Sequence, residues 1–274
     1  MSVAIEGSCL SGGFSKLTVA NDDRFKVYIH NDSGPPIKIP LRLDNIRVCS
    51  HSHPHLPPPQ KGGGKSSGCF VALGHKPRVN VVEHLFSALY GLSLFNVKID
   101  IFGEEIPFFD GSSQSFVEVL GQLQEKRSFG ALRLQQRILV ESGSAFILYE
   151  PSEKNKLLIE MEFFHPYIRI QRLTLEINRE KYISEIAPAR TFVFTDEDDP
   201  RLKNLPPYGI GVTKNNIYSK EPLRFPDEYV RHKMLDLLGD LYVLRKKLVG
   251  KITCRNTSHS LNMKFITNML NKSI

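Results

Sequence analysis

The chain has 274 residues, of which 41% are hydrophobic and 24% charged, so it can bury a core, and disordered or fibrous proteins are excluded. Its net charge of +7 favours anionic partners, which could be nucleic acid, a membrane surface or a phosphorylated small molecule. The basic residues are scattered and match no RNA-binding or zinc-finger motif, which argues against nucleic acid, and the charge fits a nucleotide-bearing substrate equally well. Because the four cysteines form no Cys-x-x-Cys pair and neither a signal peptide nor an apolar run of about 18 residues is found, we expect a cytoplasmic protein with free thiols and no transmembrane segment.

The first half of the chain begins with strands. Residues 14–48 alternate apolar and polar positions in the runs "FSKLTVA", "RFKVYIH" and "IKIPLRL", which is typical of half-buried strands. Residues 51–68 are rich in Pro, Gly, Ser and Lys and predict a surface loop. Residues 81–94 carry apolar side chains at helical spacing, and a strand and a turn then lead to a second helix at 115–123.

The second half has a similar order of elements. The charged, glycine-containing segment 124–130 is the predicted linker between a first domain at 1–123 and a second at 131–274. Four apolar runs, "LRLQQRILV", "AFILYE", "KLLIEMEFF" and "IRIQRLTLEI", predict further strands. A long amphipathic helix is predicted over 227–248.

An internal repeat emerges when the halves are aligned at two helix histidines, His84 and His232. At equal offsets from these residues stand Gly91 and Gly239, and further on the "DGSS" and "TSHS" turns, each followed by an amphipathic helix. The matched order predicts two domains of like topology, whose equivalent helices can face each other across a pseudo-twofold axis. The identities are few, so coincidence stays open at this point.

The predicted long helix carries metal-binding chemistry. His232 and Asp236 are four residues apart and therefore lie on one face, and Asp240 continues the same stripe. With His84 from the other half they would complete a set of two histidines and one carboxylate, the composition of a catalytic zinc site. The alternative is that Asp236 pairs with Arg231 or Lys233 on a solvated face while His84 is a hydrogen-bonded core residue.

Further titratable groups favour hydrolysis. Glu83 adjoins His84 and could act as a general base on a water molecule. His259, in the second turn of the repeat, is available as a general acid, and Asp240 could orient it.

Family resemblance sharpens this hypothesis. The segments "VVEHLFSALYGL", "EIPFFDGSSQSFV", "FFHP", "ARTFVF", "LRFPDEYVRHKMLDLLGDL" and "SHSLN" occur in this order and closely resemble the UDP-3-O-acyl-N-acetylglucosamine deacetylases, zinc amidases of lipid A synthesis. The likeness runs from about residue 3 to the C-terminus. It implies an α+β fold of two similar domains, each a β-sheet plus helices, with the helices sandwiched between the two sheets.

The resemblance also implies a role for each matching residue. Zn²⁺ would be held by His84, His232 and Asp236, while Glu83, His259 and Asp240 would have the roles given above. The Thr191 hydroxyl would stabilise the oxyanion, and Lys233 would supply positive charge near the oxyanion or the phosphates. The substrate would be a UDP-acyl-amino sugar, and the products acetate and a free amino sugar. We expect a monomer with at most transient contact with a membrane surface.

Three segments expected near the substrate pocket depart from the family pattern. Ser11 of "CLSGG" stands where a histidine is usual, and "GVTKNN", with the candidate substrate residue Lys214, lacks a usual glycine and aspartate. Residues 195–209, usually a helix beside the acyl tunnel, are acidic and then interrupted by proline. Phe192 and Phe194 could line an apolar channel or be core aromatics. A different N-acetylated sugar, or a non-catalytic sugar-nucleotide-binding homologue, therefore remains an alternative.

Overall fold

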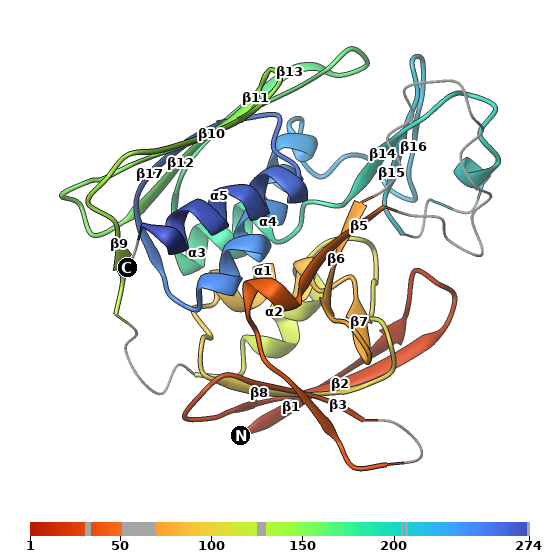
Figure 1. The fold of residues 1–274 in the computed structure, drawn as a ribbon. Coiled ribbons are helices and arrows are strands. Elements are labelled where there is room, and N and C mark those ends of the chain that lie inside the picture. Colours follow the sequence, from red (N-terminus) through yellow and green to blue (C-terminus); the bar gives the residue numbers. More distant parts are fainter. Residues whose placement is uncertain (31–33, 51–68, 125–129, 204, 206–207, 273–274) are drawn as a thin grey trace.

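The structure, a computed structural model, describes residues 1–30, 34–50, 69–124, 130–203, 205 and 208–272. Two large β-sheets lie on opposite sides of the molecule with helices between them (Figure 1). The predicted α+β class is therefore confirmed. In this part of the chain no helix has both the length and the apolar character needed to cross a membrane.

The first sheet is built from the N-terminal half. Its five strands lie in the order β1-β2-β8-β3-β4, and all neighbours are antiparallel except β3 and β8, which run parallel. The bounds are β1 Ser2–Ser8, β2 Phe14–Asn21, β3 Lys26–His30, β4 Ile37–Ile39 and β8 Val97–Phe102. Apolar side chains on one face of these strands are buried, as the alternating pattern predicts.

The second sheet repeats this topology. Its strands lie in the order β10-β11-β17-β12-β13, and again one neighbouring pair, β12 with β17, is parallel. The short strand β9 adds to β17 in parallel. The bounds are β9 Leu132–Arg133, β10 Ile138–Ser142, β11 Ala145–Glu150, β12 Leu157–His165, β13 Arg169–Ile177 and β17 Leu248–Arg255. Equal strand order and equal directions confirm the similar topology that the repeat predicts.

The helices fill the space between the sheets (Figure 1). They are α1 Glu83–Gly91, α2 Gln114–Leu120, α3 Arg179–Lys181, α4 Glu228–Leu241 and α5 His259–Asn271. Short helical turns add Leu43–Asn45, Tyr182–Ile186, Pro200–Lys203 and Tyr242–Leu244. Both sheets share one hydrophobic core with α1, α2, α4 and α5. Within it α1 and α4, from opposite halves of the chain, pack directly on each other.

Two small three-stranded sheets complete the fold. One is β5-β6-β7, with bounds Ile46–Ser50, Cys69–Gly74 and Arg78–Asn80, and the other is β14-β15-β16, with bounds Phe192–Phe194, Ile210–Val212 and Ile217–Tyr218. Neither sheet is evident from sequence periodicity, because most of these strands are too short to show an alternation. All four cysteines are free thiols, as predicted.

Several predicted element bounds were wrong. The helix expected over 81–94 is limited to Glu83–Gly91, because Val81 and Ser93 adopt positive φ angles of 62° and 60°. The helix expected over 227–248 ends at Leu241, since Arg245 is left-handed and the chain then enters β17.

Other predicted segments were shorter than expected or fall outside the described chain. The run "IKIPLRL" is a strand only as far as Ile39, before a proline that has no amide hydrogen to donate. The run "LRLQQRILV" is divided into β9 and β10. The predicted loop 51–68 and most of the predicted linker 124–130 lie outside the described residues, so the domain boundary stays a prediction.

Candidate metal centre and active site

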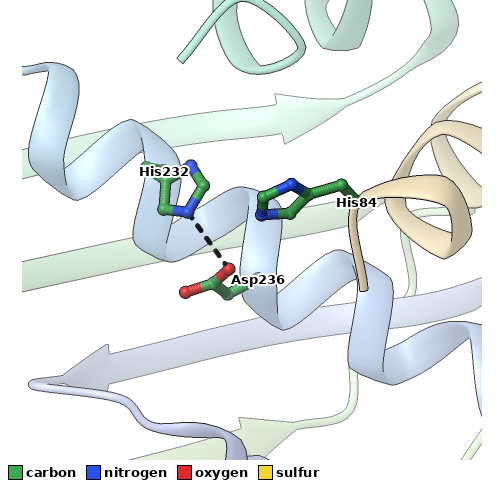
Figure 2. A group of neighbouring side chains, drawn as sticks. All are labelled: His84, His232 and Asp236. Carbon is green, nitrogen blue, oxygen red and sulfur yellow. Dashed lines mark ion pairs between the residues drawn. The ribbon is translucent and has the colours of Figure 1, made fainter. Parts of the chain in front are cut away.

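Three predicted ligands meet where α1 and α4 cross. His84 is the second residue of α1, and His232 and Asp236 lie one turn apart on α4 (Figure 2). One ligand atom from each lies within 4.8 Å of the others. The helices approach this closely because Gly239 has no side chain: a Cβ atom there would lie 2.3 Å from the Glu83 carbonyl oxygen. The two halves of the repeat thus build one site together.

The protonation states of these residues suit a metal ion. His232 Nδ1 lies 3.0 Å from the Ala189 carbonyl oxygen and donates to it, which leaves Nε2 unprotonated toward Asp236 Oδ1, 3.4 Å away. Burial and the neighbouring His232 lower the pKa of His84 to about 3, and burial lowers the pKa of His232. Burial acts to raise the pKa of Asp236, but Lys233 and the imidazoles outweigh it and lower that pKa.

The donor set therefore passes a chemical test for zinc. Two neutral imidazoles and one ionised carboxylate are ligands that Zn²⁺ takes. His84 Nδ1 is buried and has no hydrogen-bond partner among the described residues, which is unusual for a side chain that serves only as a core residue. These residues fit a zinc ion.

The alternative interpretation, in which Asp236 pairs with Arg231 or Lys233 on a solvated face, is correct only in part. Lys233 Nζ donates to Asp236 Oδ2 at 2.7 Å, but both side chains are largely buried and do not lie on a solvated face. Arg231 pairs instead with Asp227 and Glu185. The ion pair thus neutralises a charge within the site.

Glu83, the first residue of α1, is held by a backbone group. Its Oε2 accepts a hydrogen bond from the Val71 amide of β6 at 3.0 Å. The side chain is buried, and burial raises its pKa to about 7. A carboxylate with this pKa can accept a proton near neutral pH and release it again.

His259 and Asp240 form the predicted pair. His259 Nδ1 lies 2.8 Å from Asp240 Oδ2, which also accepts from the Asn262 side-chain amide at 2.7 Å. Burial acts to lower the pKa of His259, but Asp240 and Asp236 outweigh it and raise the pKa to about 9. Its Nε2 lies 4.0 Å from Asp236 Oδ1, so a protonated imidazole stands beside the ligand cluster.

Thr191, directly before β14, is clamped between two glycines. Its amide donates to the Gly111 carbonyl at 2.8 Å. A Cβ atom at Gly111 or at Gly209 would come within 2.6 Å or 2.9 Å of the Thr191 methyl carbon, and both glycines have positive φ, 80° and 146°. The glycines therefore occupy the methyl side of Thr191.

These groups share one cavity of about 290 Å³. The predicted residues that line it are Glu83, His84, Thr191, Phe192, Phe194, His232, Lys233, Asp236 and His259. Asp240 lies behind His259, as its predicted orienting role requires. Lys214 is exposed in the turn between β15 and β16 and does not line the cavity.

An aromatic cluster adjoins the candidate metal ligands. Phe192 packs edge-on against His232, with ring centroids 5.9 Å apart, and His165 stacks on Phe194 at 3.5 Å. The other members are Phe163, Tyr167 and Tyr229. Phe192 and Phe194 are thus both cavity residues and part of a packed aromatic group, so the two interpretations of them are compatible.

Some site groups were missed by the sequence analysis. The Val71 amide and the Ala189 carbonyl are backbone groups, and backbone groups give no sequence signal. Arg201 and Tyr208 line the cavity and come from residues 195–209, where only a departure from the family pattern was evident. In the other altered segment, Leu10 lines the cavity next to Ser11.

This chain is similar to a group of known proteins. A family model described as LpxC, UDP-3-O-acyl N-acetylglycosamine deacetylase, matches residues 64–271. A UDP-3-O-acyl-N-acetylglucosamine deacetylase of Geotalea uraniireducens is 32% identical over 90% of this chain and 78% of its own length. Proteins with the same name from Geobacter sp. strain M21 (34%, over 71% and 67%) and Coxiella burnetii (30%, over 89% and 78%) are similar. This chain belongs to the UDP-3-O-acyl N-acetylglycosamine deacetylase family.

Proposed function

We propose that this protein hydrolyses the N-acetyl group of UDP-3-O-acyl-N-acetylglucosamine, releases acetate and uses zinc to do so. The proposal rests on one observation. Ligand atoms of His84, His232 and Asp236 lie within 4.8 Å of one another, at a cavity that Glu83 and His259 also line. The names of the relatives supply the substrate. Cytoplasmic location, monomeric state and membrane-surface contact stay predictions.

In the proposed reaction, proton transfers are divided between two residues. Glu83 accepts a proton from the attacking water, whose oxygen forms the new bond to the acetyl carbon. His259 donates a proton to the amine nitrogen as the C–N bond breaks, which gives acetate and a free amino sugar. Both pKa values are raised, that of Glu83 to about 7 and that of His259 to about 9. This supports the division, because near neutral pH the imidazole of the acid is protonated while the carboxyl of the base can ionise.

Two further groups act on the oxygen of the amide. The Thr191 hydroxyl donates to the oxyanion of the tetrahedral intermediate, and Lys233 adds positive charge near it or near the substrate phosphates. Zinc, when bound by His84, His232 and Asp236, supplies Lewis-acid polarisation of the carbonyl and acidifies water.

The aromatic cluster supports an acylated substrate. Phe192 and Phe194 give the cavity an apolar wall next to the ligands, which suits a hydrocarbon chain. The altered segments 195–209 and 211–216 leave another N-acetylated nucleotide sugar as the second candidate, and Lys214 as a substrate contact stays a prediction.

The test is acetate release from purified protein, with UDP-3-O-acyl-N-acetylglucosamine and UDP-N-acetylglucosamine compared side by side and metal content measured. We expect about one zinc per chain and turnover of the acylated sugar. Glu83→Gln should keep the metal and lower kcat by about 10²- to 10⁴-fold, the usual worth of a general base. His84→Ala should lose the metal.

Three outcomes would count against the proposal. A folded wild type prepared with zinc that contains no metal would refute the metal centre. Turnover that is unchanged in Glu83→Gln would refute the role of Glu83 as the general base. Acetate release from the unacylated sugar alone would favour the second candidate.

A further inference from the structure

A buried ion pair lies beside the active site and takes no part in the reaction described above. Arg190 and Glu228 have side-chain exposures of 3% and 0%. The Arg190 guanidinium donates from Nε to Glu228 Oε1 at 2.9 Å and from Nη2 to Oε2 at 3.1 Å, and the Arg190 amide donates to Oε1 at 3.0 Å. The Arg224 amide donates to Oε2 at 2.7 Å. Four donors thus fix this carboxylate.

The pair joins two elements that carry site residues. Glu228 is the first residue of α4 and lies one turn before His232 on the same helix face. Arg190 stands between Ala189, whose carbonyl accepts from His232 Nδ1 at 3.0 Å, and Thr191, whose methyl group is held by glycines. Residues 189 and 190 therefore contact α4 through consecutive groups, and Thr191 follows them directly in the chain.

We propose that Arg190 and Glu228 are positioning residues for the reaction. The ion pair holds residues 189–191 against α4, so that the ring orientation of His232 and the location of the Thr191 hydroxyl are set by one clamp. This inference rests on the proposed deacetylase function for its kinetic consequences, but its consequence for metal binding does not depend on turnover.

Stability alone does not account for an ion pair at this place. Burying two charges has a large desolvation cost, and well-packed apolar side chains usually hold a helix and a neighbouring segment as well or better. A planar guanidinium on a carboxylate supplies direction, because two parallel hydrogen bonds fix the relative orientation of both groups. A fixed orientation is what a metal-binding imidazole such as His232 and an oxyanion donor such as Thr191 require.

The test compares Arg190→Lys, Thr191→Ala and the double variant. For each protein kcat, KM and zinc affinity are measured, together with the absorption spectrum after Co²⁺ is substituted for zinc. Lysine keeps the charge but cannot form the fork. We expect Arg190→Lys to lower kcat and to weaken zinc binding about 10- to 100-fold, as loss of outer groups around a metal site typically does, with KM changed less than about threefold. Arg190→Lys and Thr191→Ala should not be additive in kcat, because the first change already displaces the hydroxyl that the second removes.

Arg231→Lys is the matched control. Arg231 is on α4 next to His232, but it pairs with Asp227 and Glu185 outside the cavity. It should leave kcat and the Co²⁺ spectrum unchanged. If Arg190→Lys lowers only the melting temperature, with kcat per folded molecule and the Co²⁺ spectrum as in the control, or if the two changes multiply, the clamp is refuted.

A second variant provides the same test in case Arg190→Lys folds poorly. Glu228→Asp keeps the charge and withdraws the carboxylate by one methylene, and the same kinetic and Co²⁺ changes are expected from it. A wild type that releases no acetate would refute the proposed function, and the Co²⁺ spectra and zinc affinities would then decide on the clamp alone.

Discussion

The close packing of α1 on α4 makes Gly239 a sensitive position. In Gly239→Ala the added Cβ atom would lie 2.3 Å from the Glu83 carbonyl oxygen and 3.3 Å from the Ser87 amide nitrogen, whereas ordinary contacts begin at 3.4 Å. Both close contacts are to backbone atoms, so no side chain can rotate away. The start of α1 must therefore move by about 1 Å relative to α4 to restore an ordinary van der Waals distance.

This movement should affect activity much more than stability. Overpacking costs about 1–3 kcal/mol, and alanine recovers about 1 kcal/mol of helix propensity relative to glycine. The free energy of unfolding should therefore fall by no more than about 2 kcal/mol. The same displacement separates Glu83 and His84 on α1 from the residues of α4, and a misplacement of about 1 Å can lower kcat about 100-fold.

The assay is kcat for acetate release together with urea unfolding. Gly130→Ala is the control, because no described atom lies within 4 Å of a Cβ atom at Gly130, and we expect it to behave as wild type in both measurements. A folded Gly239→Ala protein with kcat within about threefold of wild type would show that the helix approach does not set the catalytic geometry.

Three further outcomes are expected. In metal-free protein, His259 should titrate near pH 9 by NMR, and Asp240→Asn should lower that pKa. The His259–Asp240 pair should stabilise the folded state, because the folded pKa of His259, about 9, exceeds the unfolded one. This contribution is complete below the unfolded pKa and is lost as pH rises through about 9. A His259 pKa unchanged by Asp240→Asn would contradict this assignment. Gly111→Ala should lower the free energy of unfolding by about 1–3 kcal/mol, because Gly111 has a positive φ that alanine adopts only with strain. It should also reduce kcat, because the added methyl group displaces Thr191. Full activity would contradict the inference that the glycines position Thr191. Chelation should lower the melting temperature of wild type, because an ion bound only by the folded state stabilises it, and should leave a metal-free His84→Ala protein unaffected.

The sequence predicts the fold class well but misses some strands. Alternating patterns identify β2 and β11 because one face of each is buried. The central strand β17 was missed because the apolar spacing of α4 continues through "YVLRKKL", and only the left-handed conformation of Arg245 ends the helical segment. A single backbone angle of this kind has no clear signature in a residue pattern.

The candidate site is predictable where spacing determines contact. His232 and Asp236 are found from their separation on one helix, whereas His84 and His259 are found only through the repeat and the family resemblance. The supporting hydrogen bonds from the Val71 amide and to the Ala189 carbonyl depend on how the elements pack. Residue type carries no information about them.

The two helices that cross at the candidate metal ligands occupy equivalent positions in the repeat but differ in their side chains. Four residues after His84, where α4 has Asp236 after His232, α1 carries Ala88, whose methyl group is fully buried. The duplicated architecture therefore brings one imidazole from each copy but a carboxylate from one copy alone. Each half of the repeat thus supplies part of one candidate ligand set, with two of the three residues on α4 and one on α1.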